Sequence, residues 1–387
     1  MASCVLILSN SDSGLYDFRK EVLQALLNEG RRVLVSVPDT GYVERIRQLG
    51  CEYLPTSFER RGMNPFKDLK LLLFYRRLIK RYRPEAVLTY TIKPNIYGGL
   101  AARMTKTPYL ANITGLGTTL EHEGALQKMI VLLYRTALKK ASCVFFQNKG
   151  NRDFMQEKGC VTGKCRIIPG SGVNLAEHRA QAYPPENGSG DGRKVVFLSI
   201  MRLMKDKGID ELLEVAQRIH EKHPETVFRL LGAYEEETRA HYEPLVKRLQ
   251  QSGALEYYGY RDDVPVFLAE CHALIHPSYH EGMSNVLLEA SAMGRPVITS
   301  NIPGCKEAVE DGRTGYLCAP KNADMLYNKM ELMMGKTMSE LDEMGRAARR
   351  RMEAMFDKRQ IVVQTMDMLG LHESSPAQGR KTPAVSL

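Results

Sequence analysis

The chain has 387 residues, 43% of them hydrophobic and 26% charged, and its formal net charge is +9. This length allows two or three domains with a full core. The sequence has no run of about 18 apolar residues and no signal-peptide pattern, which excludes a membrane-spanning helix and favours a cytoplasmic protein. The eight cysteines form no C-x-x-C pair, so we expect them to be reduced and mainly buried, and we expect no metal site.

In the first half of the chain, apolar strand-like segments alternate with helical patterns. The predicted strands are SCVLILS (3–9), RVLVSVP (32–38), EAVLTY (85–90), PYLANI (108–113), SCVFFQN (142–148) and CRIIP (165–169). The predicted helices lie near 15–29, 41–49, 65–82, 95–104, 124–140 and 150–158. Continuous Val-, Ile- and Leu-rich strands are typical of a parallel sheet with helices on both faces, so the expected class is α/β.

The helix expected over 64–83 belongs to the most basic stretch of the chain. Its cations alternate with apolar residues; they are Arg60, Arg61, Lys67, Lys70, Arg76, Arg77, Lys80, Arg81 and Arg83. Such a helix can lie on an anionic membrane or bind an acidic partner, or it can be a solvated helix whose apolar face enters the core. Few aromatic residues are interleaved with the cations, which disfavours a nucleic-acid partner.

The segment AYPPENGSGDGR (182–193) interrupts the alternation, as an exposed linker does. The alternation then resumes with the strands KVVFLSI, VFRLLGA, LEYYGY, HALIHPS and RPVITS. We therefore expect a first domain over 1–180, a linker over 181–193 and a second domain over 194–355. A helix over 356–370 and a disordered tail over 371–387 would follow. Ligands of such sheets bind beyond the carboxyl ends of the strands, here in a cleft between two facing domains.

The turn RLMKDKG follows the first strand of the second domain and precedes a helix. It carries Arg202 and Lys207. Cations in a strand-to-helix turn suit an anion held at a helix N-terminus, and a diphosphate is the natural ligand. A basic turn that is merely solvated is the other interpretation.

Two glutamates eight residues apart, Glu281 and Glu289, lie around the next glycine-containing turn, in HEGMSNVLLEASAMG. A helix is expected from about Ser284, which can cap it, to Met293. Eight helical residues span roughly 12 Å, too far for a paired acid and base but suitable for holding two parts of one extended ligand. The amides of Gly282 to Asn285 would face phosphates between the two carboxylates.

These segments together resemble the donor site of family 4 glycosyltransferases, which have the two-domain GT-B fold. The resemblance rests on RLMKDKG, LEYYGYRDDV, EGMSNVLLEASAMGRPVI and GCKEAVEDGRTGYL, which occur in the family's order. It implies a retaining enzyme that needs no metal and no cofactor. It also implies that Arg202 and Lys207 neutralise the donor diphosphate and that Glu289 binds the ribose.

The same resemblance implies roles for the remaining donor residues. Glu281 and the loop from His280 through Gly282, Met283 and Ser284 to Asn285 would contact the donor sugar and phosphates. Backbone near Tyr260 and Arg261 would hold the base. Gly14, in the first strand-to-helix turn, would also face the donor. Many family members have a histidine after the strand equivalent to PYLANI, whereas this chain has TGLG (114–117), so the acceptor base stays unassigned, with His122 nearby.

The first half is similar to bacterial enzymes that build lipid-linked oligosaccharides, in particular N-acetylgalactosaminyltransferases acting on undecaprenyl-diphosphate-linked sugars. The similarity covers SDSGLYDFRKEVLQAL, FERRGMNPFKDL, KPNIYGGLAARMTKTPYLANITGLG and PGSGVNL. It implies that Tyr16 and Arg19 belong to the acceptor side, and that the basic helix (Lys70, Arg76, Arg77, Lys80 and Arg81) docks on the anionic inner face of the cell membrane or on the acceptor diphosphate.

The expected reaction is therefore transfer of a hexose or N-acetylhexosamine, with N-acetylgalactosamine preferred, from a UDP-sugar to a polyprenyl-diphosphate-linked sugar. Two alternatives remain. A non-hydrolysing nucleotide-sugar 2-epimerase would convert free UDP-sugar without a lipid acceptor. A non-catalytic nucleotide-sugar-binding scaffold would keep its output after a Glu281→Gln substitution.

Overall fold

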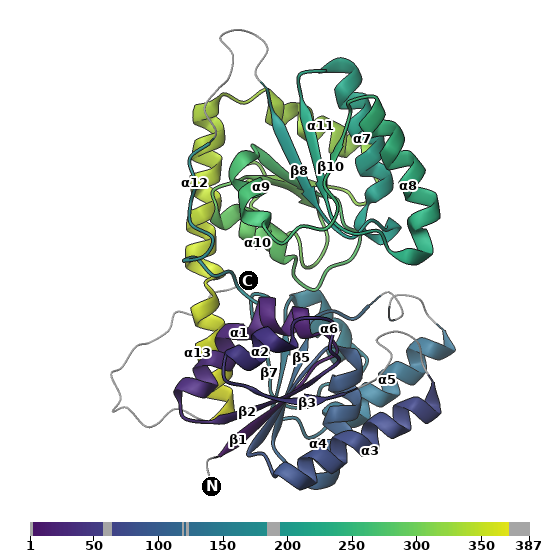
Figure 1. Ribbon diagram of the computed structural model, residues 1–387, viewed down its shortest axis with the longest axis vertical. Helices are drawn as coiled ribbons and strands as arrows, with labels where there is room; N and C mark the ends of the chain where they lie inside the picture. Colours follow the sequence, from purple (N-terminus) through teal and green to yellow (C-terminus); the bar gives the residue numbers. More distant parts are fainter. Residues whose placement is uncertain (1–2, 57–63, 118–119, 121–123, 184–193, 371–387) are drawn as a thin grey trace.

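The computed structural model describes residues 3–56, 64–117, 120, 124–183 and 194–370. Two separate parallel sheets, each flanked by helices, account for most of these residues (Figure 1). The predicted α/β fold with two doubly wound halves is therefore confirmed. No helix within these ranges is long and apolar enough to cross a bilayer. All eight cysteines are free, and all but the half-buried Cys165 are buried.

The first sheet has seven parallel strands in the order β3-β2-β1-β4-β5-β6-β7. Its strands are β1 (Cys4–Leu8), β2 (Arg32–Val37), β3 (Glu52–Pro55), β4 (Ala86–Tyr90), β5 (Tyr109–Ile113), β6 (Cys143–Phe146) and β7 (Cys165–Ile167). The strand order reverses between β1 and β4, so the crevice of this half is expected at the carboxyl ends of these two strands.

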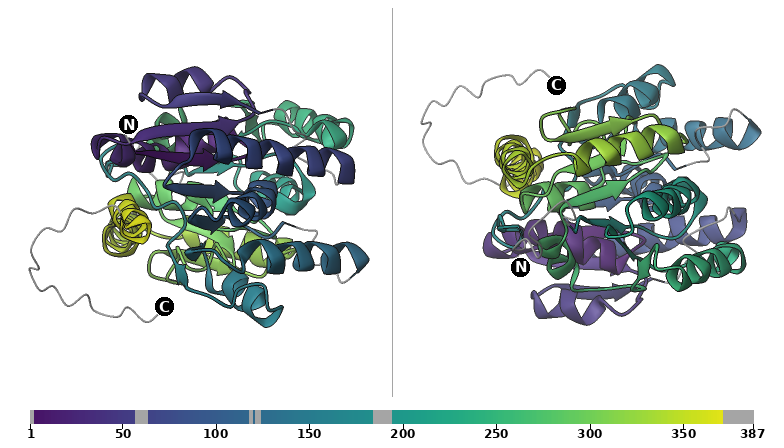
Figure 2. Two further views of the ribbon diagram at one scale, coloured as in Figure 1. Left: turned by 90° about the horizontal axis from the view of Figure 1, so that it is seen from below. Right: turned by 90° about the horizontal axis from the view of Figure 1, so that it is seen from above.

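Helices cover both faces of the first sheet (Figure 2). They are α1 (Asp12–Asn28), α2 (Val43–Gln48), α3 (Pro65–Tyr82), the π-helical η1 (Pro94–Gly98), α4 (Gly99–Thr105), α5 (Ala125–Leu138) and α6 (Lys149–Glu157). Leu15 of α1 and Ile46 of α2 enter one buried cluster. Leu71 of α3 and Ile130 of α5 enter another, because right-handed crossovers place α3 to α6 on the opposite face.

The second sheet has six parallel strands in the order β10-β9-β8-β11-β12-β13. They are β8 (Val196–Ile200), β9 (Val227–Leu231), β10 (Glu256–Tyr257), β11 (Ala273–His276), β12 (Val297–Ser300) and β13 (Gly315–Cys318). The helical segments are the 3₁₀ turn η3 (Lys205–Lys207), α7 (Ile209–Lys222), α8 (Glu236–Gln251), α9 (Val264–Glu270), α10 (Asn285–Ala292), α11 (Ala323–Met334) and α12 (Met338–Met355). The order reverses between β8 and β11, which places the turn after β8 beside the turn after β11.

The last helix that the structure describes, α13 (Lys358–Leu369), returns to the first sheet. Ile361 and Met366 of α13 are buried in the cluster that also contains the core residues of α1. Lys358 pairs with Glu21 of α1 at 3.1 Å. At the crossing point, the N–H of Val173 donates to the carbonyl oxygen of Phe356 at 2.8 Å. The first half of the fold is therefore built from both ends of the described chain (Figure 1).

The observed elements differ from the predicted ones in a few places. The two edge strands β3 and β13 are missing from the predicted set. β10 is confined to two residues of LEYYGY. Most of the predicted linker, residues 184–193, and the predicted disordered tail, 371–387, lie outside the described residues, as do Arg60, Arg61 and His122.

Candidate functional site

Lys207 and Glu281 come from the two adjacent turns after β8 and β11. The Lys207 ammonium donates to Glu281 Oε1 at 2.6 Å, and both side chains are largely buried. The turn that brings them together depends on Gly208, whose φ is +73°. A Cβ at Gly208 would lie 2.2 Å from the carbonyl oxygen of Pro277, so only glycine lets the two turns lie this close.

A buried histidine that the sequence analysis missed completes the group around Glu281. His276, the last residue of β11, lies with Nε2 2.9 Å from Glu281 Oε1 and 3.1 Å from the hydroxyl of Ser284. Burial alone would raise the pKa of Glu281, but the hydrogen bond from His276 and the charge of Lys207 outweigh it and lower the pKa to about 2. Glu281 is therefore ionised at neutral pH and cannot serve as a proton donor.

Helix α10 begins directly after this group. Ser284 occupies the N-cap position, as predicted, but its hydroxyl makes no capping hydrogen bond and contacts His276 instead. The capping role predicted for its side chain is thus wrong. Among the residues that the structure describes, no acceptor meets the N–H groups of Asn285, Val286 and Leu287. With Lys207 beside it, this helix start has the charge and the donors to bind a phosphate.

The other residues of this loop differ in exposure. Met283 is buried, and its side chain fills the space beside Gly170 of the first half. His280 is exposed, with its ring 6.4 Å from the ring of Tyr279. The side-chain oxygen of Asn285 is buried and has no hydrogen-bond partner among the described residues.

Arg202 takes a different position from Lys207. Its guanidinium is about half exposed and pairs with Glu235, just before α8. The structure therefore brings Lys207 and Glu281 together and leaves Arg202 outside that group. Arg202 would have to leave Glu235 in order to reach an anion at the start of α10.

Glu289 lies one turn further along α10, half-buried and facing the first half of the chain. Burial raises its pKa; His178 and Lys358 oppose the rise, and Glu177 adds to it. Asp17 of α1 approaches from the other side of the gap. Burial, Glu289 and Asp262 raise the pKa of Asp17 to about 6, against the effect of Arg45 and Lys20. Asp17 is a second residue that the sequence analysis missed.

The predicted base-binding segment lies at the carboxyl end of β10. The Tyr260 side chain is 65% exposed, and its hydroxyl lies 3.2 Å from that of Tyr42 in the first half. Arg261 pairs with Asp263 at 2.6 Å. Tyr260 also lines a cavity of about 420 Å³; the other lining residues are Ala233, Tyr234, Arg239, Glu243, Lys247, Gln250 and Tyr257.

On the facing side, Ser11 caps α1 by accepting the N–H of Gly14 at 3.0 Å. Tyr16 is half-buried, with its ring 6.3 Å from the ring of Tyr42. Asp12 accepts the N–H of Tyr42 at 3.0 Å and so holds the Tyr42 loop against the start of α1. The first turn predicted to face the donor is therefore ordered by its own hydrogen bonds.

Arg19, which was predicted to belong to the acceptor side, is buried within the first half. Its guanidinium lies 5.2 Å from the centre of the Tyr90 ring and donates to the side-chain oxygen of Gln147 at 2.9 Å. The Gln147 amide in turn donates to the carbonyl oxygen of Thr114 at 3.1 Å. Arg19 therefore supports the floor of the gap and does not reach the outer surface.

The two halves touch at Gly282. Asn148, the N-cap of α6, donates to the carbonyl oxygen of Gly282 at 2.6 Å. A Cβ at Gly282 would lie 1.8 Å from the carbonyl oxygen of Thr114. The loop that carries Glu281 is thus seated on the carboxyl ends of β5 and β6, and Asn148 is a third residue that the sequence analysis missed.

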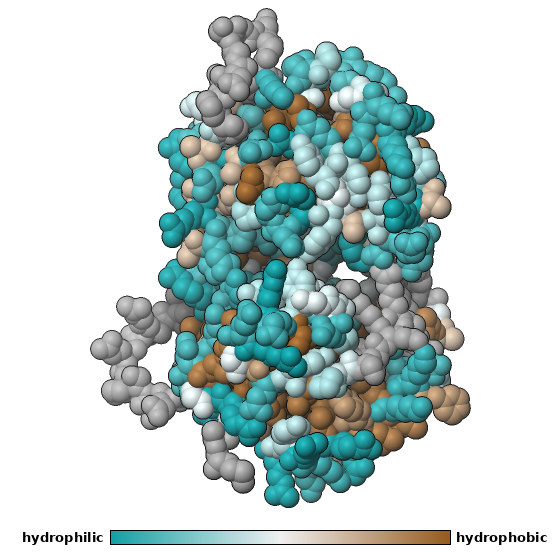
Figure 3. Space-filling model, in the orientation of Figure 1, coloured by the Kyte–Doolittle hydropathy of each residue, from teal (hydrophilic) through white to brown (hydrophobic). Residues whose placement is uncertain are grey.

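The predicted basic helix is α3, and its basic face is largely exposed. Lys70, Arg77, Lys80 and Arg81 are exposed, whereas Arg76 is half-buried. Three apolar residues on the same helix also face outward: Phe66, Leu69 and Leu73, with exposures of 81%, 53% and 45%. On α5, Leu126, Met129 and Leu132 repeat this pattern. Apolar surface is visible on this side of the first half, at the lower right of Figure 3.

Comparison with known proteins places these features in a family. Residues 183–351 match the family model of group 1 glycosyl transferases, and residues 4–148 match that of glycosyl transferase 4-like proteins. A Campylobacter jejuni N,N'-diacetylbacillosaminyl-diphospho-undecaprenol alpha-1,3-N-acetylgalactosaminyltransferase is 30% identical over 341 residues, which cover 84% of this chain and 88% of that protein.

Two further relatives are more distant. An Escherichia coli UDP-Gal:alpha-D-GlcNAc-diphosphoundecaprenol alpha-1,3-galactosyltransferase is 27% identical over 70% of this chain and 71% of its own length. The Anabaena protein HepE, solved in complex with UDP and glucose, superposes with a TM-score of 0.77 over 95% of this chain and 99% of its own, at 19% identity. That structural likeness concerns the fold.

Proposed function

The chain belongs to the group 1 glycosyltransferases of the GT-B fold, and from this premise we propose that it is a retaining enzyme that uses a UDP-sugar. The proposed reaction moves an N-acetylhexosamine or hexose, with N-acetylgalactosamine preferred, to a polyprenyl-diphosphate-linked sugar. The observation that carries the proposal is the group formed by Lys207, Glu281 and His276 at the open start of α10.

The diphosphate of the donor would bind at this helix start. In the transfer, the bond between the anomeric carbon and the UDP oxygen breaks, and the acceptor hydroxyl forms the new glycosidic bond. Negative charge grows on the leaving diphosphate, where Lys207 and the N–H groups of α10 would stabilise it. The acceptor proton would pass to a donor phosphate oxygen. Ionised Glu281 would accept a hydrogen bond from a hydroxyl of the transferred sugar.

Glu289 would accept hydrogen bonds from the ribose hydroxyls. Its half-buried carboxylate lies one turn from the phosphate-binding helix start. The base would then lie toward Tyr260, at the same edge of the second sheet. The diphosphate, the ribose and the base of one nucleotide sugar would thus bind at the start of α10, at Glu289 and near Tyr260.

The raised pKa of Glu289 leads to a prediction about stability. A carboxylate whose pKa is raised by folding stabilises the fold fully only below its unfolded pKa, and this contribution is lost as the pH rises through the folded pKa. Glu289→Gln should therefore melt at a higher temperature than the wild type at pH 7.5, and the difference should vanish near pH 4. It should also bind UDP at least about tenfold more weakly, because a charged acceptor is lost.

The matched control for this substitution is Glu331→Gln. Burial would raise the pKa of Glu331, but hydrogen bonds from Tyr327 and Lys222 outweigh it and lower the pKa. This variant should therefore melt at a lower temperature at pH 7.5 and bind UDP normally. Thermal melts across pH 4 to 8 and calorimetric titration with UDP measure both effects. A Glu289→Gln variant that melts below the wild type at pH 7.5 would contradict the account of Glu289.

The acceptor end of the proposal places α3 and α5 on the membrane. Both named relatives act on diphospho-undecaprenol-linked sugars, which supports a membrane-embedded acceptor for this chain. The outward apolar residues of α3 and α5 would enter the lipid, while Lys70, Arg77, Lys80 and Arg81 would face anionic head groups. The protein would then act as a peripheral enzyme on the inner face of the cell membrane.

This membrane contact can be tested with the triple variant Phe66→Ser, Leu69→Ser and Leu73→Ser. Withdrawing three partly inserted side chains removes about 3 kcal/mol or more, so the vesicle partition coefficient should fall roughly a hundredfold. The control replaces Val266, Leu332 and Val363, which are 52%, 55% and 52% exposed, by serine. Vesicle co-sedimentation measures both proteins, and equal binding by the two variants would argue against the contact.

The reaction itself can be tested by incubating the purified protein with a panel of UDP-sugars and a short-chain polyprenyl-diphospho-sugar. We expect a product one sugar larger, with the anomeric configuration of the donor, identified by mass spectrometry and NMR. Conversion of the UDP-sugar without acceptor would instead indicate the 2-epimerase. Donor binding without turnover of any UDP-sugar would favour the scaffold.

A further inference from the structure

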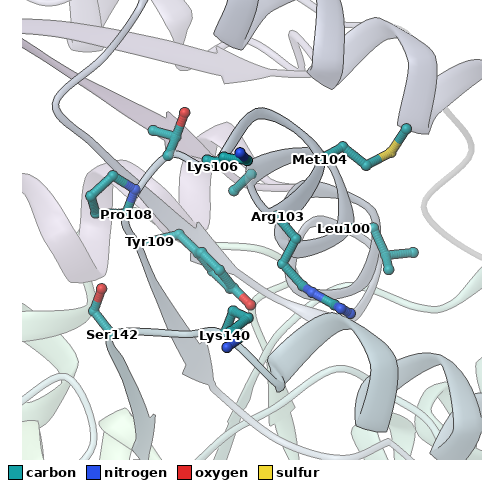
Figure 4. A pocket seen from close by; sticks show the side chains of 10 residues that line it. Leu100, Arg103, Met104, Lys106, Pro108, Tyr109, Lys140 and Ser142 are labelled. Carbon is teal, nitrogen blue, oxygen red and sulfur yellow. The ribbon is translucent and has the colours of Figure 1, made fainter.

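A cavity of about 640 Å³ lies in the first half, far from the gap between the two sheets. It opens between the C-terminal ends of α4 and α5, beside the start of β5 (Figure 4). Its lining residues are Leu100, Ala102, Arg103, Met104, Lys106, Thr107, Pro108, Tyr109, Lys140 and Ser142. None of the glycosyl-transfer residues named above belongs to it.

The polar wall of this cavity is cationic. Arg103, Lys106 and Lys140 line it, and no carboxylate does. None of the three forms an ion pair within the part of the chain that the structure describes. The C-terminal ends of α4 and α5 contribute roughly −0.5 charge each, so three full positive charges leave a net of about +2 at the cavity. The missing partner of this site is therefore an anion.

The cavity is also geometrically defined. The Arg103 guanidinium donates to the carbonyl oxygen of Thr136, at the end of α5, and this bond holds the side chain across the cavity. The buried Tyr109 hydroxyl donates to the neighbouring carbonyl oxygen of Ala137 and fixes the floor. One cation is thus held in place, and the exposed Lys106 and Lys140 can move toward a ligand.

The remaining wall is apolar and selects among anions. Leu100, Pro108 and the 52% exposed Met104 border the cations. A small inorganic anion would gain nothing from this wall. A phosphate that carries a glycerol and the first carbons of acyl chains would cover it, as apolar burial favours.

The location of the cavity links it to the proposed membrane face. Helix α4 packs between α3 and α5, whose outward apolar residues form that face. The five-residue strand β5 separates the cavity from the gap by about 16 Å, so the diphosphate of an acceptor whose sugar lies in the gap would not reach it. The phosphate of a bulk membrane lipid would reach the cavity.

We propose that this cavity binds the phosphate head group of an anionic membrane phospholipid through Arg103, Lys106 and Lys140. The inference rests on the proposed docking of α3 and α5 on a membrane. The site would anchor the first half to the membrane independently of the donor and the acceptor sugar.

The first test measures binding of the whole chain to vesicles containing about 30% phosphatidylglycerol and to vesicles of phosphatidylcholine alone. Each cation near an anionic surface contributes about a fivefold increase in partitioning, so the triple variant Arg103→Gln, Lys106→Gln and Lys140→Gln should lose about a hundredfold on the anionic vesicles. The control replaces Lys247, Arg313 and Arg346, which are 65%, 67% and 65% exposed, by glutamine. An equal loss in this control, which has the same net charge, would overturn the proposal.

The second test separates a built site from diffuse attraction. Short-chain dihexanoyl-phosphatidylglycerol, kept below its micelle concentration, should bind saturably by NMR titration, whereas inorganic phosphate at equal concentration should not compete. Ser142→Trp obstructs the cavity from an exposed position without changing charge and should abolish this binding. Non-saturable binding, or unchanged binding in Ser142→Trp, would refute the site.

Failure of this inference can be distinguished from failure of the proposed function. Transfer to a short, water-soluble acceptor in the absence of vesicles should be equal in the wild type and in the triple cavity variant. Absence of transfer in both would refute the reaction while leaving the lipid measurements intact. Loss of transfer in the variant alone would show that the three cations serve the reaction rather than the membrane, and would overturn the proposal.

Discussion

Replacing Lys207 by alanine is expected to lower kcat/KM for sugar transfer by about 100- to 1000-fold. Removing one preorganised donor from a developing oxyanion has this effect in enzymes. The substitution also leaves Glu281 buried without its cation. In the wild type the Lys207 ammonium lies 2.6 Å from Glu281 Oε1. Because the charge of Lys207 lowers the pKa of Glu281, the loss should raise that pKa and destabilise the loop before α10.

The control for this prediction lies in the same 3₁₀ turn. Lys205 is exposed, so Lys205→Ala changes the net charge equally without touching Glu281. Steady-state kinetics with the preferred UDP-sugar, together with thermal melts, separate the catalytic effect from the structural one. A Lys207→Ala enzyme within about threefold of the wild type would show that the diphosphate is stabilised elsewhere, with Arg202 as the next candidate.

Gly282→Ala is expected to reduce kcat/KM by about 100-fold while changing the melting temperature little. The added Cβ would meet the carbonyl oxygen of Thr114 at 1.8 Å, and no side-chain rotation can relieve a clash with the backbone. The two halves would have to separate by an ångström or more, which misplaces Glu281 relative to the acceptor side, and displacements of this size cost about this factor. Each core stays intact, because the clash lies between the halves.

Gly163→Ala is the matched control, because a Cβ at Gly163 would meet no atom within 4 Å. Kinetics should be unchanged in this variant. Small-angle scattering should show a larger radius of gyration for Gly282→Ala than for either the control or the wild type. Normal kinetics in Gly282→Ala would mean that the contact with Thr114 is not part of the active arrangement.

The donor side was largely predictable because its signals are local. The helix over α10, the position of Glu281 before it and that of Glu289 within it follow from one apolar pattern bounded by glycines. The position of the turn with Lys207 was predictable because an apolar strand ends just before it. The two ion pairs of this region were not predictable. Lys207 and Glu281 lie 74 positions apart in the sequence, and Arg202 and Glu235 lie 33 positions apart, so their pairing depends on strand order.

What the sequence analysis missed depends on tertiary neighbours. His276 reads as part of an apolar strand, and its ring becomes informative only once Glu281 folds back onto it. Arg19 is a residue type that is normally exposed, but the Tyr90 ring and Gln147 accommodate it in the interior. Leu69 and Leu73 have the spacing of core residues, yet no helix that the structure describes covers that side of α3. β3 and β13 are four-residue edge strands with only two and three apolar residues, respectively.

The return of α13 to the first sheet has a consequence for synthesis. The first sheet is the first part of the protein to leave the ribosome, but the buried cluster on its α1 face includes Ile361 and Met366. At usual elongation rates, the roughly 190 residues between the end of the first half and α13 take about 10 to 40 seconds to translate. During that interval the part of this cluster that α13 packs against stays uncovered. The nascent chain therefore offers chaperones an apolar surface that α13 covers in the folded protein.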